Sequence, residues 1–279
     1  MHQAATVSRP SWMVALSGGN GTRRRSPVEI VATAATYVTH NPAAGVSGLR
    51  FGKFGRWADG VIELREDCVT FASHWDAHNE QVLTEDGPLW VVLGDSTAQG
   101  LGAPSPMGGY VGQVLGGLRQ RTGRPWRVLN LCLSGALIRD VMRDQLPRIP
   151  AGAAMVTCGI GANDILYSAP AKVFADLRAL IGAVPRGTIV LDLPLPTGIW
   201  GVLGRAGVPY VTRMNQAIRS AAGARGLPVA EVSAHFLPPW TGKFASDSFH
   251  PSQHGYRDWA RALLAAIPAG SGIAPVPAW

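Results

Sequence analysis

Short runs of consecutive apolar residues alternate along most of the chain with segments in which apolar residues recur every three or four positions. The first run, residues 89–93, lies between a charged loop and a glycine, a pattern typical of a strand buried in a parallel sheet. Later apolar runs predict further strands over residues 126–133, 153–160, 188–193 and 228–232.

Most of the segments around these runs have the period of amphipathic helices. Helices are predicted over residues 67–83, 109–122, 136–146, 171–183, 211–224 and 253–267. Gly123 and Pro147 mark the ends of two of them. Residues 194–198 are expected to form a proline-rich loop, and the segment from there to residue 207 is left unassigned. Strands that alternate with helices predict an α/β domain with a parallel sheet covered on both faces.

The N-terminal part of the chain lacks this regular alternation. Residues 1–27 mix Ser, Gly, Asn and Arg without a sustained period, and we expect a flexible tail there. Residues 28–56 hold short apolar pieces broken by Asn41-Pro42 and by glycines, which predicts extended or loop structure. We therefore expect a single domain over residues 28–279, with a core at about 88–268.

The composition is that of a compact globular protein, with 47% hydrophobic and 15% charged residues among 279. No apolar run approaches the length of about 18 residues that a membrane-spanning helix needs. The apolar patch at residues 12–16 is too short for a signal peptide, and Arg23 to Arg25 follow it instead of preceding it. We therefore expect a cytoplasmic protein without a membrane span.

Net charge and cysteines narrow the partners further. Residues 1–27 carry four of the seven net positive charges, so the rest of the chain is only mildly basic. This distribution argues against nucleic-acid binding and suits a small anionic substrate. Cys68, Cys132 and Cys158 are odd in number, and two lie in strand-like runs, which predicts buried thiols rather than disulfides. No metal-binding spacing is present, and no cofactor is expected.

Candidate chemistry gathers where predicted strands end. Gly94-Asp95-Ser96 follows the first strand, although this tripeptide alone is equally typical of a turn. Polar segments also end the second and third strands, at residues 130–135 and 159–164, and residues 247–251 precede the last helix. Because ligands bind at the carboxyl ends of parallel strands, we expect these segments to meet at one site.

Together these segments resemble the SGNH branch of the GDSL hydrolases over residues 88–268. The family's blocks appear in order as Gly94-Asp95-Ser96, Gly135, Gly161-x-Asn163-Asp164 and Asp247-x-x-His250-Pro251. The resemblance implies a flavodoxin-like three-layer α/β/α fold with a five-stranded parallel sheet. It further implies Ser96 as nucleophile, His250 as general base and Asp247 as the residue that orients it. The oxyanion hole would comprise Ser96, Gly135 and Asn163, and Cys132 stands where a glycine is common.

The residue types themselves suit this chemistry. A serine hydroxyl needs a neighbouring base to become a nucleophile, and histidine suits that task at neutral pH. Asp247 can hold the other ring nitrogen of His250 and stabilise the imidazolium. Taken singly, each motif has a structural alternative: a helix cap for Asp-x-x-His and for Asn163-Asp164, and a tight turn for Gly135. Asp95 and Asp164 are interpreted as structural.

A further histidine has the spacing of a metal-binding pair on a helix. His254 lies four residues after His250, but no third ligand is evident in the sequence, so a surface or capping histidine is preferred. No metal site is therefore predicted.

The expected reaction forms an acyl-Ser96 intermediate from an ester or acyl-CoA and passes a short or medium acyl chain to a carbohydrate hydroxyl, with hydrolysis as a side reaction. The segment before Ser96 is similar to intracellular mycobacterial octanoyltransferases that acylate a glucosylglycerate precursor of methylglucose lipopolysaccharide. That likeness implies an octanoyl chain and a glucosylglycerate acceptor. The alternatives are an esterase or thioesterase that uses water as acceptor, and a non-catalytic binding protein with the same cleft.

Overall fold

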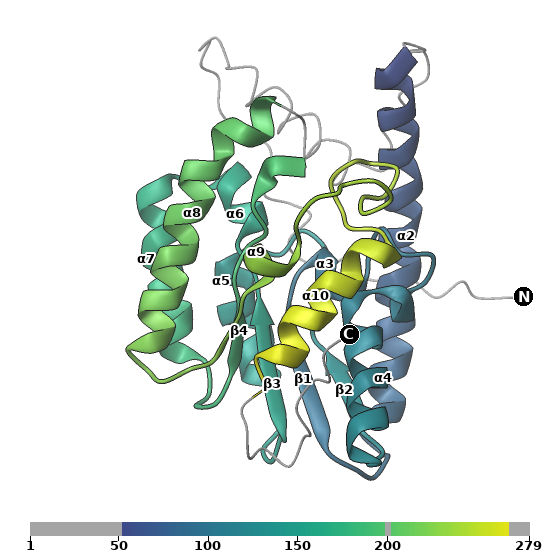
Figure 1. Ribbon diagram of the computed structural model, residues 1–279. Helices are drawn as coiled ribbons and strands as arrows, with labels where there is room; N and C mark the ends of the chain where they lie inside the picture. The colour runs from purple at the N-terminus through teal and green to yellow at the C-terminus, as the bar shows by residue number, and fades with distance from the viewer. Residues whose placement is uncertain (1–51, 199–201, 268–279) are drawn as a thin grey trace, which may run out of the picture.

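The computed structural model of the protein describes residues 52–198 and 202–267 and shows a parallel sheet between two layers of helices (Figure 1). Five strands lie side by side in the order β2-β1-β3-β4-β5, which is the flavodoxin-like order. Their bounds are Leu89–Gly94 (β1), Arg127–Asn130 (β2), Met155–Gly159 (β3), Ile189–Leu191 (β4) and Val229–Ala230 (β5). Every pairing is parallel, so the predicted fold class is confirmed.

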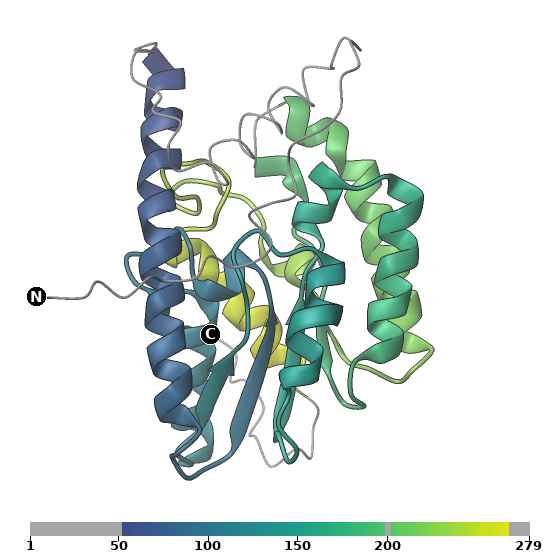
Figure 2. The same ribbon diagram turned by 180° about the vertical axis from the view of Figure 1, so that it is seen from behind.

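Helices cover both faces of this sheet (Figures 1 and 2). One face carries α2 (Gly52–Val82), α4 (Tyr110–Thr122) and α10 (Gln253–Ala265). The other face carries α5 (Ile138–Asp140), α7 (Pro170–Ala183) and α8 (Val202–Gly223). The shorter elements are α3 (Ser96–Gln99), η2 (Pro106–Gly108), η3 (Val141–Gln145), η4 (Leu146–Arg148), α6 (Ala162–Tyr167), η5 (Pro196–Gly198) and α9 (Val232–His235).

The central strand β1 shows why its sequence is apolar without alternation. Trp90 and Val92 pack with the core that α4 and α10 cover, whereas Val91 and Leu93 pack with the core beneath α7 and α8. All residues of β1 are buried. A strand covered on both faces has no solvent side, so both alternating sets of side chains are apolar.

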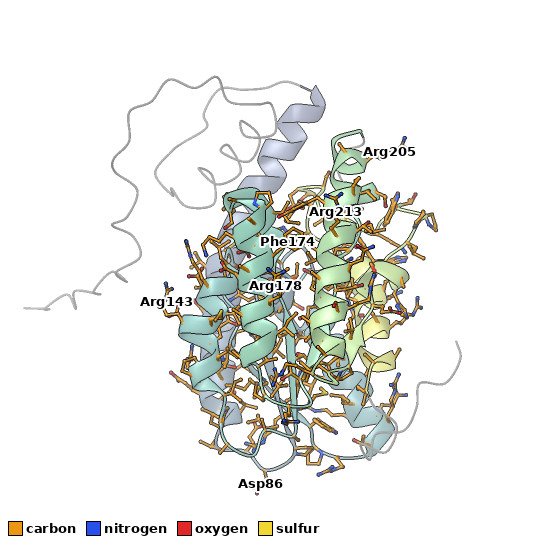
Figure 3. All side chains as sticks on the ribbon, turned by 90° about the vertical axis from the view of Figure 1, so that its left-hand side faces the viewer. Asp86, Arg143, Phe174, Arg178, Arg205 and Arg213 are labelled. Carbon is orange, nitrogen blue, oxygen red and sulfur yellow. The ribbon has the colours of Figure 1, made fainter. Side chains whose placement is uncertain are left out.

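On the outer side of the second layer, α7 and α8 pack against each other (Figure 3). The ring of Phe174 meets the ring of Tyr210 edge-on, with centroids 5.9 Å apart. Arg178 and Arg213 are exposed on the same two helices. The pair therefore has the apolar inner face and charged outer face that the amphipathic pattern predicts.

Several predicted boundaries are wrong. The helix predicted over residues 136–146 is divided into α5, a π-helical turn at η3 and a 3₁₀ turn at η4, and Pro147 lies inside that last turn. Helix α8 begins at Val202 and continues through Pro209, a residue that ordinarily ends a helix. The short helices α6 and α9 were not predicted. All predicted strands after the first are longer than β2 to β5.

The first residues that the structure describes are helical. Residues 52–56, predicted as loop, are the first residues of α2, and the glycines at 52 and 55 gave the misleading loop signal. The predicted tail at residues 1–27 and the remaining residues 28–51 lie outside the described part of the chain. None of the helices in residues 52–198 and 202–267 combines the length and apolar character needed to cross a membrane.

Candidate active site

The candidate nucleophile lies where the central strand ends. Ser96 is the first residue of α3 and follows β1 closely. It is buried, with 8% of its surface exposed. Asp95 caps this helix, because its Oδ1 accepts a hydrogen bond from the backbone N–H of Thr97 at 3.0 Å. The same carboxyl oxygen accepts from the Thr97 hydroxyl at 2.8 Å. The structural role predicted for Asp95 is thus the capping of the short helix that presents Ser96.

The structure brings together the serine, histidine and aspartate that the sequence singled out. Ser96 Oγ lies 2.9 Å from His250 Nε2, across 154 positions of sequence. On the other side of the ring, His250 Nδ1 lies 2.6 Å from Asp247 Oδ2. A hydroxyl, an imidazole and a carboxylate therefore form one hydrogen-bonded series.

The loop before α10 is folded so that Asp247 and His250 meet. Asp247 Oδ1 accepts the backbone N–H of Phe249 at 2.9 Å and that of His250 at 3.0 Å. The backbone N–H of Ala245 donates to the carbonyl of His250 at 2.9 Å. Ser252, not Asp247, caps α10, since its Oγ accepts from Gly255 N–H at 3.2 Å. The helix-cap alternative for Asp-x-x-His is therefore excluded.

The charge of Asp247 is set by opposing effects. Burial alone would raise the pKa of this carboxyl, but the attraction of the His250 ring and the hydrogen bonds from that ring and from the loop backbone outweigh it. The pKa of Asp247 is consequently lowered from its usual value. An ionised carboxylate is thus held directly beside the imidazole, with its side chain only 7% exposed.

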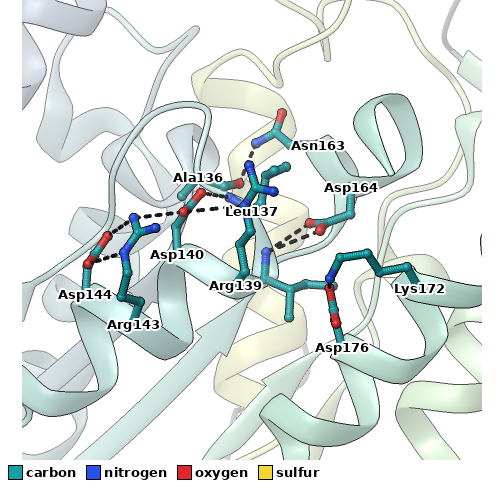
Figure 4. A network of polar contacts seen from close by, with 11 residues as sticks. Ala136, Leu137, Arg139, Asp140, Arg143, Asp144, Asn163, Asp164, Lys172 and Asp176 are labelled. Atoms are coloured by element: carbon teal, nitrogen blue, oxygen red, sulfur yellow. Dashed lines mark hydrogen bonds and ion pairs between the residues drawn. The ribbon is translucent and has the colours of Figure 1, made fainter. Parts of the chain in front are cut away.

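The expected oxyanion-hole residues lie at the ends of neighbouring strands. Gly135 follows β2 in a left-handed conformation, with φ +78°, and Asn163 is in the first turn of α6, after β3. The side-chain amide of Asn163 donates to the carbonyl of Ala136 at 3.0 Å (Figure 4). Ser134 Oγ donates to Gln99 Oε1 of α3 at 2.5 Å. Hydrogen bonds therefore join the loop that carries Gly135 to α3, the helix of Ser96, and to Asn163.

Asp164, the neighbour of Asn163, makes a hydrogen bond to the segment that follows this loop. Its Oδ2 accepts the backbone N–H of Ile138 at 3.1 Å, so it links α6 to α5. Burial raises its pKa to about 6, because an ionised carboxyl is costly away from water. The structure thus gives Asp164 the structural role that the sequence predicted.

The remaining candidates take no part in the Ser96 site. Cys132 and Cys158 are buried, and burial raises the pKa of Cys132 well above its usual value and that of Cys158 to about 12, so both remain thiols. His254 is exposed in the first turn of α10. Within residues 52–198 and 202–267, no three His, Cys, Asp or Glu side chains are grouped as metal ligands would be.

Sequence reasoning missed several buried amide side chains near the strand ends. Gln99, Asn130 and Gln145 are each 2% exposed. Gln99 donates to the carbonyl of Cys132, just after β2, and Gln145 donates to the carbonyl of Gly94 at the end of β1, whereas Asn130 donates to the carbonyl of Ala98 in α3. The signal was an uncharged polar residue within an otherwise apolar segment. Such residues are ordinarily assigned to solvent, and only the structure shows that they lie inside.

The fold and the site together define a class. A buried serine at the carboxyl end of a central parallel strand, bonded to an imidazole that a carboxylate holds, is the arrangement of a serine hydrolase. The sequence matches the model of the GDSL-like lipase/acylhydrolase family over residues 92–257, which is more than half of the chain and includes Ser96, Asp247 and His250. The chain belongs to this family and is a hydrolytic enzyme of the esterase and acylhydrolase type.

Solved structures share the fold at low sequence identity. TesA is 20% identical with a TM-score of 0.51, over 63% of this chain and 95% of that one. Axe2, an acetylxylan esterase from Geobacillus stearothermophilus, is 23% identical with a TM-score of 0.52, over 67% and 96%. The lipase Lip_vut3 from a goat rumen metagenome is 18% identical with a TM-score of 0.54, over 66% and 99%. A search of curated proteins found no matching sequence.

Proposed function

We propose that the protein is a serine acyl-transfer enzyme that works through an acyl-Ser96 intermediate. The observation that carries this proposal is the hydrogen-bonded series from Ser96 Oγ to His250 Nε2, at 2.9 Å, and from His250 Nδ1 to Asp247 Oδ2, at 2.6 Å. These distances place a base in direct reach of the hydroxyl proton and a carboxylate in reach of the resulting positive charge.

The first half-reaction makes the acyl-enzyme. Ser96 Oγ bonds to the carbonyl carbon of the acyl donor as its proton passes to His250 Nε2. The resulting imidazolium lies beside the Asp247 carboxylate. The carbonyl oxygen becomes an oxyanion that accepts from the backbone N–H groups of Ser96 and Gly135 and from the side-chain amide of Asn163. The bond to the leaving group then breaks, and the departing alkoxide or thiolate takes the proton from His250.

The second half-reaction releases the acyl chain. An acceptor hydroxyl loses its proton to His250 Nε2 as its oxygen bonds to the acyl carbon of acyl-Ser96. Collapse of the second tetrahedral intermediate breaks the bond to Ser96 Oγ, which regains a proton from His250. A hydroxyl held in the cleft has an effective concentration far above that of the same group in solution, and it can therefore compete with water.

The proposed donor is an ester or acyl-CoA with a short or medium acyl chain, and the proposed acceptor is a carbohydrate hydroxyl. Axe2, which shares the fold, is by its name an esterase of an acetylated polysaccharide, which supports a carbohydrate as the partner of the acyl group. The resemblance to octanoyltransferases gives octanoyl transfer to a glucosylglycerate as the particular case. Coenzyme A as donor accords with the cytoplasmic location expected from the sequence.

A positively charged side chain close to the loop of Gly135 supports the proposal that the donor or the acceptor is an anion. Arg139 lies on α5, directly after this loop, and 61% of its side chain is exposed. Its Nε is 3.9 Å from Asp140 Oδ1, a long contact for an ion pair, whereas Arg143 makes the 3.0 Å contact to the same oxygen (Figure 4). The Arg139 guanidinium is thus available to a carboxylate or phosphate on the donor or acceptor.

The test is a product analysis with acyl-CoAs of several lengths, each with and without sugar acceptors that include glycerate-bearing ones. We expect an acylated sugar, faster release of CoA when the acceptor is present, and a lower rate with added salt or in Arg139→Gln. Free acid as the sole product would assign water as acceptor and make the protein an esterase or thioesterase. Absence of both turnover and fluorophosphonate labelling would indicate a non-catalytic binding protein.

A further inference from the structure

Buried amide side chains pair with the backbone at the carboxyl ends of several strands. In each case the amide oxygen accepts the N–H of one residue, and the amide nitrogen donates to the carbonyl of the same residue. Asn79 makes this pair with Asn130 at the end of β2, at 2.9 and 2.7 Å. Asn215 makes it with Leu193, just after β4, at 2.9 and 2.7 Å. Gln145 makes it with Gly94 at the end of β1.

The pair between Gln145 and Gly94 has good hydrogen-bond geometry. The N–H of Gly94 donates to Gln145 Oε1 at 2.9 Å, and Gln145 Nε2 donates to the carbonyl of Gly94 at 2.8 Å. Gln145 is 2% exposed, and it ends the π-helical turn η3. Single π turns inside helices are rare and occur often at functional sites. Here the turn places a glutamine from the second helical layer against the strand that leads to Ser96.

Gly94 is the point at which the parts of the active site join. Its carbonyl also accepts the N–H of Leu133, at 3.4 Å, from the loop that carries Gly135. A Cβ on Gly94 would lie 2.4 Å from the carbonyl oxygen of Gly159, the last residue of β3. The residue after Gly94 is Asp95, which caps the helix of Ser96. A group that fixes Gly94 therefore fixes the nucleophile relative to the ends of β2 and β3.

We propose that Gln145 is a positioning residue of the acyl-transfer reaction, which holds Gly94 so that Ser96 stays aligned with His250 and with the oxyanion donors. This inference rests on the function proposed for Ser96. The side chain of Gln145 bonds to the N–H and the carbonyl of Gly94, two residues before Ser96, so its effect on the serine is transmitted through the backbone of Gly94. A displacement of about 1 Å at reacting atoms can cost on the order of 100-fold in rate.

The expected effect is on turnover more than on substrate binding. Loss of the pair lets the end of β1 move relative to the loop of Gly135, which weakens contacts made only in the transition state. The hydrogen bonds of Gln145 go to the backbone of Gly94, so its loss acts on the alignment of Ser96 and we expect KM to change little. A purely structural role would lower the amount of folded protein and leave the kcat of the folded fraction unchanged.

The test variant is Gln145→Met, which keeps the length of the side chain and removes both hydrogen bonds. A cavity of about 130 Å³ borders Gln145, Gln99 and Asn130, so a truncation to alanine would admit water that could replace the lost amide. The matched control is Asn215→Leu, which removes the corresponding pair at the end of β4, away from Ser96. If Gln145→Met does not fold, Gln145→Glu retains the acceptor for Gly94 N–H and serves in its place.

The measurements are kcat and KM for a p-nitrophenyl ester and the rate of labelling by a fluorophosphonate probe, each per folded protein. We expect kcat and the labelling rate to fall by about 10- to 100-fold in Gln145→Met, with KM within about twofold, and to stay within about twofold of wild type in Asn215→Leu. Equal losses in both variants, or no loss in Gln145→Met, would overturn the positioning role. Failure of wild-type Ser96 to label would instead overturn the proposed function.

Discussion

At the scale of the residue, Asp247 uses each carboxyl oxygen for a different purpose. One oxygen accepts from the loop backbone and the other from the ring of His250. Their spacing of three positions permits this contact, and the family resemblance predicted that the two residues cooperate. The contact between His250 and Ser96 spans 154 positions, so only the rule that strand ends gather, together with the family resemblance, could predict it.

Replacing Asp247 by Asn should lower kcat by on the order of 10²- to 10⁴-fold, because the amide stabilises neither the required tautomer nor the imidazolium.

The lowered pKa of Asp247 also predicts how the stability of the protein depends on pH. The ionised Asp247 carboxylate stabilises the fold fully at pH values above 3.8, its usual pKa in the unfolded chain. This stabilisation is lost as the pH falls through the lower pKa of the folded state. Urea unfolding at several pH values should show the stability gap between wild type and variant narrowing below about pH 4.

Asn163→Ala should lower kcat by about 10²- to 10³-fold with a smaller change in KM, since its amide is strongest where negative charge develops. The 3.0 Å bond to the Ala136 carbonyl occupies one N–H of this amide and leaves the second to the substrate oxygen. Steady-state kinetics with one ester substrate is sufficient. An unchanged kcat would remove Asn163 from the oxyanion hole.

Asp164→Asn should stabilise the protein above about pH 6. Because burial raises the pKa of Asp164 to about 6, the wild-type fold is favoured below the usual value of 3.8 and loses stability as pH rises from there through 6. The neutral amide avoids this loss and can still accept from Ile138 N–H. Unfolding free energies should agree at pH 4 and differ by up to about 3 kcal/mol at pH 7. A pH-independent difference would contradict the raised pKa.

At the scale of the element, periodicity predicted the elements that bury apolar side chains regularly, and it failed where contacts between distant residues determine the backbone. The strand β1 and the helices α4, α7 and α10 lie within a few residues of their predicted positions, because β1 is buried on both faces and each helix buries one regular apolar face. The helix predicted after residue 136 is broken instead into unlike turns, and one of them places Gln145 against Gly94. No local pattern reports that a glutamine bonds to a distant strand.

Gly94→Ala tests the junction between these elements. The added methyl group would lie 2.4 Å from the Gly159 carbonyl oxygen, a backbone atom that cannot rotate away. We expect a loss of about 1–3 kcal/mol in the free energy of unfolding, as for other overpacked sites, together with reduced activity. Thermal and urea denaturation measure the first effect. Wild-type stability would show that β1 and β3 separate more easily than the close contact implies.

At the scale of the whole molecule, the alternation of strands and helices predicted a parallel sheet covered on both faces. Periodicity does not give the order of the strands in the sheet, because the strands share the same apolar pattern and that pattern does not say which of them pair. The family blocks supplied that order, and with it the expectation that Ser96, Gly135, Asn163 and His250 converge. The identity of the acceptor depends on the shape and charge of the cleft surface, which short motifs do not encode.

The most direct test of the central claim is the intact mass of the protein after brief mixing with an activated ester, followed by mapping of the modified peptide. We predict a mass increase equal to one acyl group in wild type, located on Ser96, and none in Ser96→Ala. An acyl group that persists in Ser96→Ala, or that maps to another residue in the wild-type protein, would contradict the acyl-Ser96 mechanism.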